Sequence, residues 1–224
     1  MSILQELTAA AGGSLKAGLN DADLHGFECS LPGPLPSGIK ELLRYAAGLE
    51  CPSIGSVDFT GRSNRFEFRE IVPYGIALAE SNGNFWVQDI AENGLWGRVF
   101  FFCHDPATVV LQFDSLCAFV KAAIEGDKLD EEANRMALVA WQDVDSGVTF
   151  EEAIRSDDVK LVNFAQSLPD NKFRIFDLRS PIGGNAFAWG RGGHDLVCRR
   201  AGTDLIFAVA FKASKKGIFS RIFE

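Results

Sequence analysis

Three consecutive residues, Cys103, His104 and Asp105, have the side chains from which thiol enzymes build a nucleophile, a base and a carboxylate. Their spacing works against that chemistry, because neighbours on a strand point to opposite faces of a sheet and the thiol could not reach the adjacent imidazole. A structural role is favoured instead. Asp105 precedes Pro106 and can cap the turn after the strand, while His104 can bond backbone groups at the sheet end. The sequence therefore predicts no catalytic residue here.

Motifs for metals and cofactors are incomplete. The cysteines contain no Cys-x-x-Cys pair, and the histidines are isolated from them and from one another. Segment 143–147 begins like a calcium loop, but Gly147 replaces its third acidic ligand. Glycine-rich segments 183–184 and 190–193 lie between predicted strands, where no helix N-terminus is available to bind a phosphate. We expect no metal and no cofactor.

Aromatic and acidic residues suggest protein binding instead. Trp86 and Trp96 could each anchor a partner, because a desolvated tryptophan often contributes a large share of binding energy, although at least one of them is expected to pack in the core. The carboxylates around them could face a basic partner or form an ordinary solvated surface. The candidate partner-binding residues are Asp58, Glu67, Glu70, Glu80, Trp86, Asp89, Glu92 and Trp96.

A predicted antiparallel meander must position most of these residues. Asn82 and Gly83 accept positive φ and favour a tight turn between strand 74–79 and the alternating strand 85–90. The polar segment 91–94 then reverses the chain into the continuously apolar strand 99–103. A further strand, with Phe66 and Phe68 on its buried face, is expected before Pro73.

Helices are expected on both sides of this meander. A short amphipathic helix covers residues 3–11, and a second opens at Pro36 and stops at Gly48. A third is capped by Asp114 and ends at Gly126. The sequence therefore predicts an α+β fold in which an antiparallel sheet is flanked by helices.

The charged segment 127–132 is the predicted boundary between a domain of residues 1–126 and a C-terminal α+β extension, residues 127–224, of unknown role. A helix from Leu129 is expected, followed by another that a capping box of Thr149 and Glu152 opens. Four strands then form a second module or extend the first sheet. These strands are predicted at 172–178, 186–189, 195–199 and 204–211.

Residues 1–126 resemble the SUKH superfamily of Smi/Knr-like proteins. The shared features are an early helix opened by Leu-Pro and ended by glycine, a glycine-and-aromatic hairpin, a strand ending in His-Asp-Pro and a closing amphipathic helix. The residues that carry the resemblance are Leu35, Pro36, Gly48, Gly83, Trp86, Asp89, His104, Asp105 and Pro106. Many bacterial members are immunity proteins that bind and neutralise a toxin, and fungal members are signalling scaffolds. The resemblance implies binding without catalysis, but it transfers no toxin-contact residues.

Charge is distributed unevenly. Residues 1–154 hold 10 Lys and Arg against 23 Asp and Glu, a net charge of −13, whereas residues 155–224 hold 12 against 7, a net charge of +5. An acidic domain repels nucleic acid and accelerates its encounter with a basic protein, although general solubility is an alternative reason for the charge. The basic residues near the C-terminus form no long stripe with interleaved aromatics, so no nucleic-acid partner is expected.

Composition favours a folded cytoplasmic chain. Of the 224 residues, 47% are hydrophobic and 11% aromatic, which is enough for a substantial core. No apolar run is long enough to span a membrane, the first residues lack the pattern of a secretion signal, and the five separated cysteines are expected to be reduced. The sequence predicts a non-catalytic, cytoplasmic immunity protein that occludes a protein toxin such as a basic nuclease. A regulatory scaffold and an enzyme of unrecognised type are the alternatives.

Overall fold

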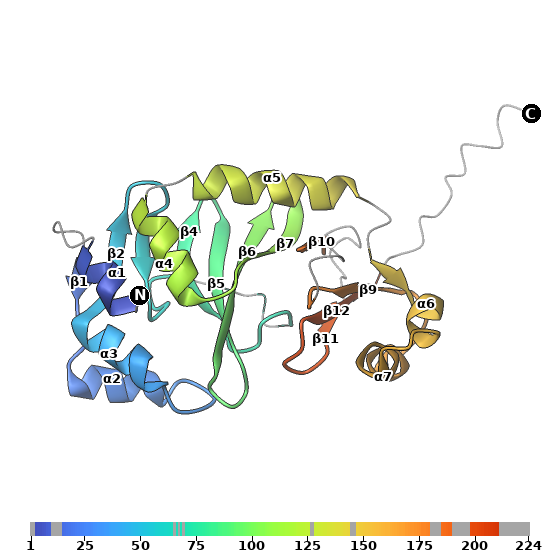
Figure 1. Ribbon diagram of the computed structural model, residues 1–224, viewed down its shortest axis with the longest axis horizontal. Coiled ribbons are helices and arrows are strands. Elements are labelled where there is room, and N and C mark those ends of the chain that lie inside the picture. The colour runs from blue at the N-terminus through green and yellow to red at the C-terminus, as the bar shows by residue number, and fades with distance from the viewer. Residues whose placement is uncertain are drawn as a thin grey trace, which may run out of the picture.

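The computed structural model in Figure 1 describes residues 3–9, 15–64, 66, 68, 70–125, 128–143, 147–179, 185–189 and 198–210. Across these residues the chain forms seven helices and three antiparallel sheets, which confirms the predicted α+β class. The helices are α1 (Ile3–Ala9), α2 (Asp21–Glu28), α3 (Ser37–Tyr45), α4 (Leu116–Glu125), α5 (Leu129–Gln142), α6 (Phe150–Ile154) and α7 (Val159–Ser167).

The central sheet contains the predicted meander. Its strand order is β10-β7-β6-β5-β4, formed by β4 (Ile76–Ser81), β5 (Asn84–Ile90), β6 (Trp96–His104), β7 (Ala107–Phe113) and β10 (Ala186–Ala188). Asn82 and Gly83 both have positive φ in the β4–β5 turn, as the sequence predicts. Strand β7 was not predicted, although its run of β-branched residues is typical of a strand.

The two faces of the central sheet are both buried. Phe101 and Cys103 of β6 point into a core shared with α4 and α5, whereas Phe100 and Phe102 point into a second core shared with the C-terminal sheet. Figure 1 shows α5 lying along one side of the sheet. Burial on both faces explains why β6 is a continuous apolar run instead of an alternating one.

Two predictions about the N-terminal part of the chain are wrong, and one of them concerns its smaller sheet. This sheet has the order β1-β2-β3, formed by β1 (Leu15–Ala17), β2 (Ala46–Cys51) and β3 (Gly55–Asp58). Helix α3 ends at Tyr45, so Gly48 is a strand residue and not a helix stop. No strand is found at residues 66, 68 and 70–72, where Phe66 and Phe68 pack as aromatic side chains of a loop.

Gly48 lies where β2 and β3 approach most closely. A Cβ on Gly48 would lie 2.1 Å from the Val57 carbonyl oxygen, a backbone atom of the paired strand. We expect Gly48→Ala to lower the free energy of unfolding by about 3 kcal/mol, because the strands must separate to admit the methyl group. Urea denaturation measures this change. Gly38→Ala is the control: its Cβ meets nothing within 4 Å, and α3 should gain up to about 1 kcal/mol. Equal stability of the two variants would contradict the explanation.

The C-terminal sheet has the order β11-β12-β9-β8, and α6 and α7 cover one of its faces. Its strands are β8 (Val148–Thr149), β9 (Phe173–Asp177), β11 (Cys198–Arg200) and β12 (Ile206–Ala210). Thr149 and Glu152 form the predicted capping box of α6. The residues after 126 therefore do two things: α5 packs on the central sheet and β10 extends it, while β8, β9, β11 and β12 form a separate sheet. The predicted domain boundary stays a prediction.

Some sequence predictions fall outside the described residues, among them the glycine-rich segments 183–184 and 190–193, Gly126 and most of strand 195–199. The cap of α4 differs from the prediction, because the Ser115 hydroxyl accepts a hydrogen bond from the Ala118 N–H, while Asp114 pairs with Arg98. None of the helices in the described part of the chain is both long and apolar enough to cross a membrane.

Candidate protein-binding site

The eight candidate partner-binding residues do not form one surface. Trp86, Asp58 and Asp89 are buried, and Trp96 is half-buried. Glu67 lies outside the described residues. The remaining three, Glu70, Glu80 and Glu92, are exposed. A partner could touch the three buried side chains only if they left their present environments; contact through the others stays a prediction.

Trp86 is a core residue. Its side chain is fully buried between β5 and the helices, and its ring centroid lies 4.9 Å from that of Phe101. The indole Nε1–H donates a hydrogen bond of 2.8 Å to Gln112 Oε1 on β7. This tryptophan therefore has both its apolar surface and its polar group satisfied inside the protein.

Asp58 organises the loop after β3. One carboxylate oxygen accepts hydrogen bonds from the Thr60 N–H and hydroxyl at 2.8 and 2.7 Å, and the other accepts from the Ser63 N–H and hydroxyl at 2.9 and 2.7 Å. Burial by itself raises the pKa of Asp58, but these four hydrogen bonds outweigh it and hold the pKa below its ordinary value.

Asp58→Asn is expected to lower the free energy of unfolding by about 1–3 kcal/mol at neutral pH, because an amide can accept on only one side. Since the folded-state pKa is lowered, the carboxylate stabilises the fold above its unfolded-state pKa and loses this effect as pH falls. The difference between wild type and variant should therefore shrink below about pH 4. Urea denaturation across pH measures it. Asp114→Asn, at an exposed ion pair, is the control; a pH-independent difference would contradict this role.

Asp89 is held by a residue of the C-terminal sheet. The two terminal guanidinium nitrogens of Arg200, Nη1 and Nη2, donate to the two carboxylate oxygens of Asp89 at 2.7 Å, and the Arg200 and Asp89 side chains are only 6% and 9% exposed. Arg200 also donates to the carbonyl oxygens of Asp204 and Thr203, at 3.0 and 3.3 Å. The sequence predicted that Asp89 lies on a binding surface, but its carboxylate forms an internal ion pair instead.

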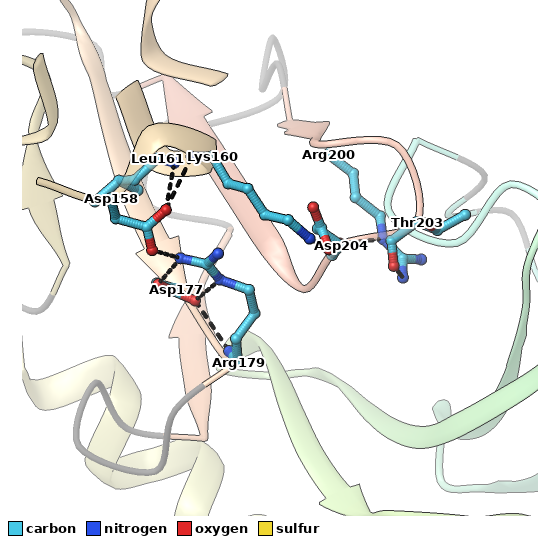
Figure 2. A network of polar contacts seen from close by, with 8 residues as sticks. All are labelled: Asp158, Lys160, Leu161, Asp177, Arg179, Arg200, Thr203 and Asp204. Atoms are coloured by element: carbon cyan, nitrogen blue, oxygen red, sulfur yellow. Dashed lines mark hydrogen bonds and ion pairs between the residues drawn. The ribbon is translucent and has the colours of Figure 1, made fainter. Parts of the chain in front are cut away.

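A network of polar contacts continues from this ion pair to α7 (Figure 2). Lys160 Nζ lies 2.9 Å from Asp204 Oδ1, and the Lys160 N–H donates to the Asp158 carboxylate that caps α7. Asp158 also accepts a 2.6 Å bond from Arg179, which makes two further side-chain bonds to Asp177. These contacts fix the C-terminal sheet to its helices and to the central sheet, so we assign the network a structural role.

The Cys103, His104 and Asp105 triplet has the geometry that strand alternation predicts. Cys103 is buried and His104 exposed on the opposite face. Burial raises the pKa of the Cys103 thiol, which is the opposite of what a nucleophile requires. The His104 ring bonds a side chain and not the backbone groups that were predicted, since its Nδ1 lies 2.8 Å from Asn84 Oδ1. The backbone N–H of His104 donates to the same oxygen at 3.0 Å.

Trp96 lies in an apolar groove at the other end of the hairpin. The groove has a volume of about 350 Å³, and its lining comes from α1, α3 and the start of β6. Leu95 is 63% exposed, and the Trp96 indole N–H has no acceptor among the described residues. The lining residues are Ile3, Pro36, Gly38, Ile39, Glu41, Leu95 and Trp96.

Two glycines hold the turn that carries Leu95 against the segment before α3. A Cβ on Gly33 would lie 2.7 Å from the Asn93 carbonyl carbon, and a Cβ on Gly94 would lie 2.8 Å from the carbonyl carbon of Gly33. Gly94 also has a positive φ of 81°. Within the turn, the Leu95 N–H donates to Asn93 Oδ1 and its carbonyl accepts from Ala91. The exposed leucine is therefore on a fixed backbone.

The charge beside the groove is negative. Glu41 lines it and Glu92 lies in the adjoining turn; both are exposed and neither has an ion pair within the part of the chain that is described. The two basic residues of α3 are already neutralised, since Lys40 pairs with Glu28 at 2.7 Å and Arg44 with Asp21 at 3.0 Å. This groove, with its exposed leucine and unpaired carboxylates, is the best candidate for binding another protein.

Of the groove residues, sequence reasoning selected Trp96 and, beside the groove, Glu92. It missed Gly38, Glu41 and Leu95; the signal for Leu95 was an isolated leucine in an otherwise polar turn. A comparison of the chain with models of protein families and with curated proteins found no match. The resemblance to the SUKH superfamily therefore rests on the residues quoted for it and remains a hypothesis.

Proposed function

We propose that this protein is a non-catalytic immunity protein that binds a basic protein toxin and blocks it by occlusion. The groove beside Trp96 is the observation that carries the proposal, because it combines a pre-organised exposed apolar side chain with carboxylates that lack basic partners. Exposed apolar surface next to uncompensated charge favours a protein partner over a small neutral ligand. The resemblance of residues 1–126 to the Smi/Knr-like proteins points to the same class.

Electrostatics would bring the partners together. The −13 net charge of residues 1–154 attracts a basic toxin, such as a nuclease with a phosphate-binding cleft, over about 10 Å at moderate salt. Short-range contact in an apolar groove is much less sensitive to salt. Added salt should therefore slow association more than it accelerates dissociation. Such a mechanism needs one molecule of this protein for each toxin molecule and no reaction.

Co-expression tests the proposal in cells. Each basic protein encoded beside the gene that stops growth when it is expressed alone is induced with and without this protein, and growth is followed. We expect growth to be restored in proportion to the amount of protein until the two are equimolar, because occlusion is stoichiometric. Toxicity that persists although both proteins accumulate in soluble form would reject the proposal.

A regulatory scaffold is the second candidate, and one observation favours it. Leu138 and Val139 are exposed neighbours on α5, in the region after residue 126. A scaffold would use this C-terminal surface. Leu138→Glu would then abolish partner binding while a change in the groove would have no effect; the immunity proposal predicts the reverse.

A further inference from the structure

We infer that the groove beside Trp96 is an anchoring pocket for one bulky apolar side chain of a partner segment in which lysine or arginine flanks that side chain. This inference rests on the proposed function and specifies the chemistry of the partner. At about 350 Å³ the groove is at the small end of the range of binding pockets, about 300–1,000 Å³, which suits a single side chain and its neighbours.

The apolar wall of the pocket is pre-organised. Leu95 is fixed by the 91–95 turn, whose Ala91 N–H and Leu95 carbonyl are bonded to each other at 2.9 Å. Ile39 lies on α3, where it is buried in the same core cluster that Trp96 packs against. A partner side chain would therefore find a wall already in place. Little conformational entropy needs to be lost on this side of the complex.

Charge selects the flanking residues of the partner. Glu41 projects from α3 at the edge of the groove, and Glu92 lies three residues before Leu95. Because Lys40 and Arg44 are paired with Glu28 and Asp21, the field beside the groove stays negative. Lysine or arginine next to the anchor would be attracted, and aspartate or glutamate repelled. An acidic partner segment should therefore bind more weakly in this groove than a basic one.

Gly38 leaves one side of the pocket open. It lines the groove, it is exposed, and a Cβ built on it would meet nothing within 4 Å. A large side chain at position 38 can therefore fill the groove, where the partner side chain would bind, without disturbing α3. Gly26 on α2 is a matched control, since it is also an exposed helical glycine whose Cβ would meet nothing within 4 Å, but it does not line the groove.

Peptide titration followed by NMR tests the inference on the full chain. The probe is a short peptide with one phenylalanine between lysines, and its counterpart has glutamates in place of the lysines. We expect the lysine peptide to shift the Trp96 indole N–H, the Leu95 amide and the Ile39 methyl signals. The glutamate peptide should bind at least about tenfold more weakly. Gly38→Trp should lower the affinity of the protein for the lysine peptide by at least about tenfold, and Gly26→Trp should leave this affinity unchanged.

Three results would overturn the inference: no shift at these groups, equal binding of the two peptides, or a folded Gly38→Trp variant that binds like wild type. The outcomes also separate the two proposals. If the toxin is neutralised while the lysine peptide does not shift the groove residues, the immunity function stands and the anchoring pocket falls. If the peptide binds in the groove while no toxin is neutralised, the pocket stands and the immunity function falls.

Discussion

Arg200→Ala is expected to lower the free energy of unfolding by about 3–5 kcal/mol, because the change leaves the Asp89 carboxylate buried without its partner. The two side chains are almost inaccessible to water and are joined by two bonds of 2.7 Å. Arg200 also connects the segments around it, since it donates to the carbonyls of Asp204 and Thr203 and lies 5.4 Å from the centre of the Phe207 ring. Its loss therefore removes the link from β11 to Asp89 of the central sheet and also removes contacts within the β11–β12 hairpin.

Urea denaturation of the full chain measures this effect. Arg44→Ala is the matched control, because the Arg44–Asp21 pair is exposed, with 54% and 87% of the side chains accessible, and should contribute less than about 1 kcal/mol. The double variant Asp89→Leu, Arg200→Met removes both charges and should recover part of the lost stability. If Arg200→Ala cost no more than Arg44→Ala, the buried pair would not be what joins the two regions.

Phe207→Ala should lower the free energy of unfolding by a similar amount, about 3–5 kcal/mol, because it removes the side chain at the centre of the core between the two sheets. Phe207 on β12 is fully buried, its ring stacks on Phe187 of β10 at 5.1 Å, and it meets Phe100 of β6 edge-on at 6.1 Å. These rings come from three strands and two sheets. A cavity at this point cannot be filled by one flexible neighbour.

Thermal and urea unfolding of this variant should still show one cooperative transition, because the shared core couples the sheets. Val159→Ala is the control: Val159 is also apolar but exposed on α7, so its truncation should change stability by less than about 0.5 kcal/mol. Two separated transitions in wild type, with only the second one moved by Phe207→Ala, would show that the two sheets unfold independently.

The elements that the sequence predicted well are those with a local cause. Asn82 and Gly83 specify the β4–β5 turn because the backbone there must adopt positive φ. Thr149 and Glu152 likewise specify the start of α6 through bonds within one turn of helix. Gly48 misled the prediction because glycine serves both as a helix stop and as a point of close backbone approach, and only the paired strand β3 decides between the two.

The site depended on contacts that are distant in sequence. Asp89 and Arg200 are 111 residues apart, so no pattern around Asp89 could show that its carboxylate is neutralised inside the fold. The groove has the same origin, since α1, α3 and the β5–β6 turn meet there only after folding. Trp96 and Glu92 were predicted from their residue types. Leu95 was not, because a single leucine in a turn is common and the sequence does not show whether it is exposed.

Calorimetric titration of the purified full-length protein with the purified toxin encoded beside its gene tests the central claim most directly. The account predicts a complex of one molecule each, loss of toxin activity at the same equivalence point, and an affinity that falls as salt is raised but remains measurable. Gly38→Trp should weaken the complex, and Gly26→Trp should not. Absence of heat and of inhibition at low salt, with both proteins folded, would contradict the account.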